Sequence, residues 1–562
     1  MKRQTLTHWL PPLLLFLIPL AIYASSLNNY FVAWDDNILV YNNPLVLHFS
    51  PYAVWAVFTS YDPELYIPLT FLSYQIEHLI FGLNATVFHT TNLLLHCGNV
   101  IMVYFLLQRW NITRSVAFVL ALIFAIHPMN SEAVAWVSAR KDTLSSFFFL
   151  ATLLQWERYH TDLSKKKYWS AVVLFLLALL SKVSIALLPV VLLLVDWRDG
   201  RPIDRKTIQE KIPFFLLSGI FIVVALFGKT SNIAALSMMQ TALMACKSIA
   251  FYILTFLFPF RISSIYQQST PITILSPEFA LPALSTLLLL ALIIISLRST
   301  RIIAFSTLFF LVMLLPAFAN FTKAGGIYYA ADRYIYMAQI GLLYLFGIGW
   351  MHLRMSAHAR MTGLVTTAVL IVLLPTYAWA SYSRSILWGD SETLFRDALA
   401  KNAKSAMIHF NLGVLEQDRG DFVEARVLYA KAREVRPDYS PAYNNEGLIY
   451  RNEGNSEEAE QWFKKAVEVD PHNLAAVINL ATAHLDRGDA DGAIVLLKQA
   501  LSEDQYNVQA LIKLGAAYGK KEMYREGLAA FQKAWRLDPV MHKESKQLER
   551  MLQKLDEKDS SE

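Results

Sequence analysis

SPAYNNEGLIYRNEGNSEEAEQWFKKAVEVDPHN, residues 440–473, is the stretch that decides the fold of the last third of this 562-residue chain. The same pattern begins again at residues 406, 474 and 508, so its period is 34 residues. The eighth position of every unit is small: Gly413, Gly447, Ala481 and Gly515. The twenty-fourth position is a large apolar residue: Tyr429, Phe463, Leu497 and Phe531. Small residues allow two antiparallel helices to approach closely, while the large residue fills the seam to the neighbouring unit.

This period and pattern are typical of tetratricopeptide repeats, which stack as an α-solenoid. We predict repeats at 406–439, 440–473, 474–507 and 508–541, a half repeat at 391–402 and a capping helix at 542–558. The repeat domain is expected to cover 384–562, after a membrane domain at 1–383.

Charge is distributed very unevenly between these two parts. Residues 391–562 carry 24 Lys and Arg against 29 Asp and Glu, whereas residues 1–390 carry 26 against 16. The front of the chain is therefore hydrophobic with a basic excess, which we interpret as membrane orientation and not as nucleic-acid binding. Cys97 and Cys246, the two cysteines, lie in apolar surroundings and exclude a disulfide framework.

Apolar stretches long enough, or nearly long enough, to cross about 30 Å of hydrocarbon recur through the front of the chain. We predict an all-α bundle of about eleven spans, near 9–27, 88–108, 115–131, 143–159, 168–182, 183–197, 212–229, 280–297, 302–319, 334–350 and 362–380. The first span resembles a signal peptide, but the many spans after it favour an uncleaved helix.

The stretch 243–260 is ambiguous, since it contains Lys247 and ends at Pro259. If it does not cross, nearly every clustered positive charge lies on one side, which the positive-inside rule assigns to the cytoplasm. The first loop, 28–87, and the repeats then share the outer side. We expect an integral protein of a bacterial inner membrane.

Candidate catalytic side chains lie in or beside the expected outer loops. Asp35 and Asp36 are adjacent carboxylates just after the first span, suited to a general base or to a divalent metal, although such a pair is also common in turns. Glu132 follows the His127-Pro128 break. Arg140 and Arg333 are outer arginines that could hold a lipid phosphate or act as interfacial anchors.

The order of six motifs along the chain is distinctive. They are Phe31–Asp36, Tyr66–Thr70, Phe88–His96, His127-Pro128 with Glu132, Arg140–Leu144 and Asp332–Tyr336. With the attached repeats, this order resembles the transmembrane-and-tetratricopeptide O-mannosyltransferases and their bacterial relatives, multi-spanning enzymes that use lipid-linked sugars.

The resemblance implies inverting sugar transfer, with mannose expected, from a polyprenyl phosphate to an extracytoplasmic hydroxyl, such as Ser or Thr of proteins. It implies Asp35, Asp36 and Glu132 as catalytic residues and Arg140 and Arg333 as binders of the donor phosphate. His127, Tyr334 and Tyr336 would support the site, and a metal requirement stays open. Asp332 replaces the Glu of the family motif, so its role is in doubt.

The repeats carry asparagine at the sixth position of three units: Asn411, Asn445 and Asn479. Because this position lines the concave face of such arrays, the amides could bind an extended polypeptide, although asparagine is also frequent there for structural reasons. Two other functions compete with an enzyme that recruits its acceptor in this way. One is a non-catalytic membrane scaffold for envelope assembly, and the other is a lipid-linked glycan polymerase or ligase.

Overall fold

Helices make up nearly all of the structure, a computed structural model that describes residues 2–61, 65–228, 236–260, 262–323, 326–355, 359–402 and 404–537. The chain folds as two compact units, Met1–Asn402 and Ala403–Glu562. The predicted combination of a membrane helix bundle with C-terminal repeats is confirmed.

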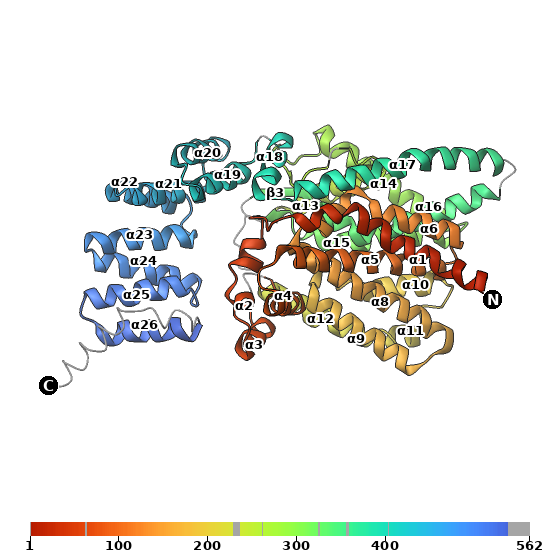
Figure 1. The fold of residues 1–562 in the computed structure, drawn as a ribbon, viewed down its shortest axis with the longest axis horizontal. Coiled ribbons are helices and arrows are strands. Elements are labelled where there is room, and N and C mark those ends of the chain that lie inside the picture. The colour runs from red at the N-terminus through yellow and green to blue at the C-terminus, as the bar shows by residue number, and fades with distance from the viewer. Residues whose placement is uncertain are drawn as a thin grey trace. The chain divides into compact units, whose positions relative to one another are not determined.

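The first unit is a bundle of long helices (Figure 1). They are α1 (Lys2–Ile22), α5 (Ala85–Arg109), α6 (Arg114–Ile126), α8 (Arg140–Asp162), α9 (Lys165–Ser181), α10 (Leu188–Arg198), α12 (Ile212–Phe227), α13 (Met238–Leu257), α14 (Pro277–Ser296), α15 (Arg301–Phe318), α16 (Ile335–Arg354) and α17 (Ala359–Leu387). Helix α5 packs against α1, α6 and α8, and α8 packs against α9. Fully buried aromatic side chains such as Trp110 and Phe305 hold the bundle together.

By length and composition, six helices of the described part could cross a membrane. They are α5, α13, α14, α15, α17 and the stretch Asp332–Arg354, and the bent pair Arg114–Ile126 and Pro128–Ala135 would be a seventh. The ambiguous stretch around 243–260 therefore forms a helix, α13, of sufficient length. The predicted count of about eleven spans is not confirmed.

The first loop contains short helices instead of irregular chain. They are α2 (Pro44–Leu47), α3 (Pro51–Thr59) and α4 (Pro68–Phe81). Proline occupies the first turn of each, where its missing N–H is not needed, and Asn43 and Ser50 cap the first two. Their apolar sides bury Val46, Phe71 and Val137 in a small core of their own.

A small antiparallel sheet is the exception to the predicted all-α fold. Its strands are β1 (Tyr266–Gln267), β2 (Thr322–Lys323) and β3 (Gly326–Ala330), with β3 in the middle. No sequence signal pointed to it, because two of the three strands are only two residues long.

The boundary between the two units differs from the predicted one at 383/384. Helix α18 (Ser391–Lys401), the predicted half repeat, belongs to the first unit. Leu394 is buried with Trp136 and Trp388, and the Phe395 ring lies 5.7 Å from that of Trp34. These apolar contacts with the first unit outweigh the resemblance of α18 to a repeat helix.

The second unit has its helices in the predicted register. They are α19 (Ala406–Asp418), α20 (Phe422–Val435), α21 (Ser440–Asn452), α22 (Ser456–Val469), α23 (Leu474–Arg487), α24 (Ala490–Glu503), α25 (Val508–Lys520) and α26 (Tyr524–Leu537). The two helices of each pair lie side by side (Figure 1). The predicted capping helix at 542–558 lies outside the described residues.

The seam between the paired helices of one repeat is closely packed, and the large residue lies in this seam, against the small residue of its own repeat, although it was predicted to fill the seam to the neighbouring unit. A Cβ added to Gly447 would lie 2.7 Å from Cε1 of Phe463, closer than van der Waals contact allows. The third repeat uses the opposite combination, Ala481 with the smaller Leu497, and both are fully buried.

We predict that Gly447→Ala overpacks this seam and destabilises the repeat by about 1–3 kcal/mol. Adding Phe463→Leu should recover part of that loss, because the pair then matches Ala481 and Leu497. Amide hydrogen exchange in α21 and α22 of the full chain would measure both effects. Unchanged exchange in the single variant would contradict the packing argument.

Candidate active site

The His127-Pro128 break brings the predicted residues together. Helix α6 ends at Ile126, and after a 50° bend the chain continues through α7 (Ser131–Ala135) and the 3-10 turn Val137–Ala139 into α8. The His127 ring lies between the Phe256 carbonyl, 3.1 Å from Nε2, and the Met129 N–H, which donates to Nδ1 at 3.3 Å. A carbonyl can only accept, so this arrangement is that of a neutral imidazole that holds the break in place.

Asp36 ties the first loop to the turn before α8. Its side chain is fully buried, and it accepts hydrogen bonds from Val32 N at 3.0 Å, from Ser138 N at 2.9 Å and from Ser138 Oγ. Burial raises the pKa of Asp36 to about 6, although these hydrogen bonds oppose the rise. Both carboxylate oxygens are therefore engaged in holding two segments together.

Asp35, the neighbouring carboxylate, is in a different situation. It is half-buried, and its side chain forms no hydrogen bond to a residue that the structure describes. It interacts electrostatically with the cations of Lys141 and Arg333. Of the two adjacent acids, Asp35 is the one whose oxygens remain available to a ligand.

Glu132 and Arg333 form a buried ion pair. The Arg333 side chain donates through Nη1 to Oε1 of Glu132, and its backbone N–H donates to Oε2 at 3.2 Å. The guanidinium also lies 5.2 Å from the ring centre of Trp136 and 5.0 Å from that of Tyr334. Its Nε and Nη2 donate to no residue of the described part of the chain, so they could still bind an anion.

Arg140 differs from Arg333 because most of its N–H groups are already bonded within the protein. Its fully buried guanidinium donates to Asn92 Oδ1, to Glu77 Oε1 at 2.8 Å, to Ser73 Oγ at 3.2 Å and to the Phe88 carbonyl at 2.7 Å. Four of its five N–H groups are occupied by the protein itself. These contacts join α4, α5 and α8, which favours a positioning role.

Two lysines complete the cluster of charges around Trp136. Lys141, the residue after Arg140, places Nζ 5.0 Å from the centre of the indole. Lys182 follows α9, pairs with Asp142, and lies 5.9 Å from the ring centre of Tyr334.

Lys182 was not among the predicted site residues. It is a lone lysine at the end of the predicted span 168–182, on the side that carries few positive charges, and this position was the signal that could have identified it.

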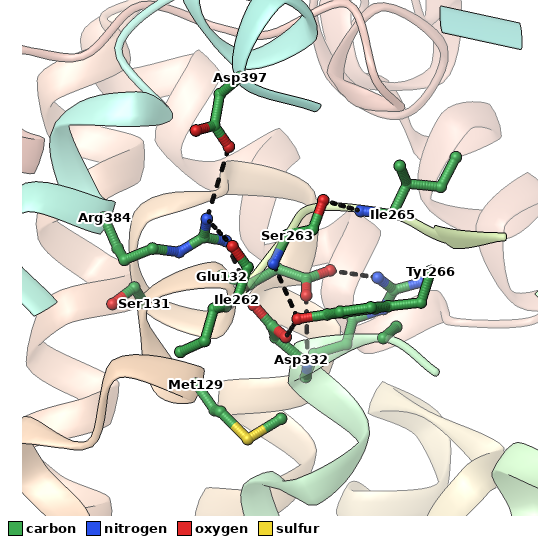
Figure 2. A network of polar contacts seen from close by, with 12 residues as sticks. Met129, Ser131, Glu132, Ile262, Ser263, Ile265, Tyr266, Asp332, Arg384 and Asp397 are labelled. Atoms are coloured by element: carbon green, nitrogen blue, oxygen red, sulfur yellow. Dashed lines mark hydrogen bonds and ion pairs between the residues drawn. The ribbon is translucent and has the colours of Figure 1, made fainter. Parts of the chain in front are cut away.

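Tyr336 and Asp332 are structural members of the motif that contains Arg333. The Tyr336 hydroxyl lies 2.7 Å from His96 Nδ1 and accepts from Asn99 at 3.2 Å, inside the bundle. Asp332 accepts from the Tyr266 hydroxyl at 2.6 Å and from Arg384 Nη2 at 3.2 Å (Figure 2). Asp397 of α18 lies 3.6 Å from the same guanidinium. This network fixes the turn that presents Arg333.

Among the described residues, no three His, Cys, Asp or Glu side chains are grouped as a metal would need. An open groove of about 770 Å³ lies beside the first loop, but the predicted catalytic residues do not line it. Its walls include Asn29, Tyr30, Phe81 and Asn84.

The three predicted asparagines of the repeats differ in their surroundings. Asn479 lines a hollow of about 440 Å³ together with Arg451, Thr482 and Lys513, and it hydrogen-bonds to Asn444 at 2.8 Å. Asn445 donates to the Tyr429 hydroxyl at 3.2 Å. Asn411 is half-buried and does not line this hollow. The three amides therefore do not form a uniform ladder.

Comparison with known proteins agrees with the two-part architecture. The profile of the family described as dolichyl-phosphate-mannose-protein mannosyltransferase matches residues 66–228, and two tetratricopeptide repeat profiles match residues 404–472 and 450–513. Among solved structures, the repeats are similar to YrrB, a TPR protein with an unusual peptide-binding site. The similarity has 21% identity and a TM-score of 0.24, over 28% of this chain and 89% of YrrB.

Curated relatives extend across both parts. The chain is 24% identical to human protein O-mannosyl-transferase TMTC1 over 495 residues, 75% of this chain and 55% of the relative. It is 25% identical to protein O-mannosyl-transferase F38B6.6 of Caenorhabditis elegans over 448 residues, 76% of this chain and 63% of the relative. The chain thus spans less than two thirds of the length of either relative. The membrane-domain match, the repeats and these relatives together show that the chain is similar to the protein O-mannosyl-transferases in both of its parts.

Proposed function

We propose that the protein is a membrane glycosyltransferase that transfers a sugar from a polyprenyl-phosphate carrier to a hydroxyl group outside the cytoplasm. Mannose and a hydroxyl oxygen of a protein are the substrates suggested by the names of its relatives, and Ser and Thr side chains carry such hydroxyl groups. We place it in a bacterial inner membrane, with the first loop and the repeats on the periplasmic side, the arrangement that the charge distribution favours when α13 does not cross the membrane.

The observation that carries the proposal is the unequal engagement of the two adjacent acids. Asp36 is consumed by structural hydrogen bonds, whereas Asp35 has no bonded partner in the described part of the chain and lies within electrostatic range of Lys141 and Arg333. A half-buried carboxylate can remove the proton of an acceptor hydroxyl, and cations beside it can stabilise the phosphate that leaves with a negative charge.

In the proposed reaction, Asp35 takes the proton of the acceptor hydroxyl as its oxygen attacks C1 of the sugar. The bond between C1 and the phosphate oxygen breaks, and its electron pair leaves with the polyprenyl phosphate. Arg333, held by Glu132, stabilises that phosphate through its remaining N–H groups. Glu132 and Arg140 act by positioning in this scheme, and a divalent metal is not assigned.

The repeats would recruit the acceptor polypeptide. The hollow beside Asn479 offers amide, hydroxyl and cationic groups, and two cations, Arg451 and Lys513, line it without an acidic side chain. Such a surface can bond to the backbone and to acidic side chains of an extended segment.

We predict that Asp35→Asn lowers sugar transfer by about 10²–10⁴-fold, the usual contribution of a general base. The thermal midpoint should change little, because the side chain forms no hydrogen bond to described residues. Transfer assayed with purified protein and a panel of polyprenyl-phosphate sugars would measure this. Full activity of Asp35→Asn would exclude Asp35 as the base, and no transfer by the unmodified protein with any donor would favour the scaffold function.

Asp36→Asn provides the matched comparison. Both carboxylate oxygens of Asp36 accept a hydrogen bond from a backbone N–H. In the variant, one of these oxygens is replaced by an N–H₂ group, so one backbone N–H faces another donor. We expect a loss of about 1–3 kcal/mol from the unmatched buried donors, seen as a lower thermal midpoint. A stable Asp36→Asn protein that has lost only its activity would reverse the roles assigned to the two acids.

For the repeats, we predict that Asn479→Ala combined with Lys513→Gln reduces capture of polypeptide by a photo-crosslinking residue placed at Thr482. Loss of two polar contacts worth about 1 kcal/mol each corresponds to a decrease of roughly tenfold or more. Asn411→Ala, outside the hollow, is the control and should leave capture unchanged. Equal capture by all variants would mean that these asparagines serve the repeat fold alone.

A further inference from the structure

Lys141 is a buried cation without a bonded partner. Its side chain is 6% exposed, and its Nζ finds no hydrogen-bond acceptor within the described part of the chain. Burying an ammonium group without a partner is costly, so such groups usually lose their proton, move to solvent or bind something. Burial lowers the pKa of Lys141 to about 8, while Asp35 and Asp142 oppose that shift, so the group is still mostly charged at neutral pH.

The neighbouring acids do not supply the missing partner. Glu132 is paired with Arg333, and Asp142 is paired with Lys182. Asp35 is close enough to interact electrostatically with Lys141, but no hydrogen bond joins the two side chains. After the two ion pairs are formed, one cation, Lys141, and one carboxylate, Asp35, remain in the cluster.

Trp136 brings the unpaired cation close to a second cation. The Lys141 Nζ lies 5.0 Å and the Arg333 guanidinium 5.2 Å from the centre of the same indole. Trp136 is held in place by two contacts. Asn92 donates a hydrogen bond to the Trp136 backbone carbonyl at 2.8 Å, and the Trp136 ring stacks on that of Trp388 with the ring centres 5.4 Å apart. Two cations on one rigid ring repel each other, and Asp35 offsets this repulsion only through space, because no hydrogen bond joins it to Lys141.

We propose that Lys141 binds the phosphate of the lipid donor, with its Nζ donating to a phosphate oxygen beside the free N–H groups of Arg333. The inference rests on the proposed function for the identity of the anion. As the bond to the sugar breaks, the phosphodiester with one negative charge becomes a phosphomonoester with up to two. An ammonium group in a water-poor site is well placed to stabilise that added charge.

Binding of farnesyl phosphate to the full chain in detergent tests the proposal, with farnesol and inorganic phosphate as separate probes. The wild-type protein should bind farnesyl phosphate more tightly than farnesol. Lys141→Gln should weaken farnesyl phosphate at least tenfold and leave farnesol unchanged, and Lys141→Arg should recover most of the affinity. Lys247→Gln is the matched control, because Lys247 also lies over an aromatic ring, Tyr329 at 4.1 Å, but is paired with Glu278.

The assignment would be overturned if the Lys141→Gln protein bound farnesyl phosphate as tightly as the wild type does. It would also be overturned if the wild type bound farnesol and farnesyl phosphate equally tightly. Inorganic phosphate bound as tightly as farnesyl phosphate would indicate a free-anion site and would also overturn it. If the Lys141→Gln protein does not fold, the test is instead the rate at which an acetylating reagent modifies the Lys141 amine in the wild type. Farnesyl phosphate, and not farnesol, should protect the residue.

The two hypotheses fail in distinguishable ways. If the wild type transfers sugar and the Lys141→Gln protein binds farnesyl phosphate as tightly as the wild type, only the role of Lys141 is excluded. Absence of transfer with every donor, together with Lys141-dependent binding of farnesyl phosphate, would remove only the glycosyltransferase proposal.

Discussion

The hydrogen bonds of Asp36 to Val32 and Ser138 are the contacts on which the arrangement of the candidate site depends. They join the first loop to the turn before α8, two segments about one hundred residues apart in the chain. One consequence is that Asp35 is held near Lys141, which lies in the first turn of α8. Another is that the two adjacent acids cannot share a role, since the buried one is occupied by backbone and hydroxyl donors.

The proline break after α6 has a complementary effect. A continuous helix would carry Glu132 and Trp136 onward along its axis, but the 50° bend and the short turns return the chain and place these residues beside Arg333. Helix termini and irregular backbone in such a turn need polar partners, and here Asn92, Tyr74 and Asp36 supply them from three separate segments. The result is a cluster of charges that contains two ion pairs together with Lys141 and Asp35, which are not hydrogen-bonded to each other.

The second unit follows a simpler physical rule. Each repeat contacts mainly its neighbours, so its packing is determined by residues within about 34 positions of one another. The side-chain volumes of the two paired helices compensate each other. Where one helix has Gly447 the other has the large Phe463, and where one has Ala481 the other has the smaller Leu497. The surroundings of the sixth position differ between repeats that share this packing, as Asn411, Asn445 and Asn479 show.

Short-range periodicity in the sequence determined the repeats with their register and the apolar helices. The residue types of the outer loops and the order of the motifs named Asp35, Glu132, Arg140 and Arg333 as candidates. Only the tertiary structure decided which of these side chains retain free polar groups. The polar groups of Arg140 and Asp36 are hydrogen-bonded to partners from distant segments. Lys182 joins the cluster through its ion pair with Asp142, and α18 packs within the first unit. The physical reason is that hydrogen-bond satisfaction and burial depend on contacts between residues far apart in the chain, which no local pattern records.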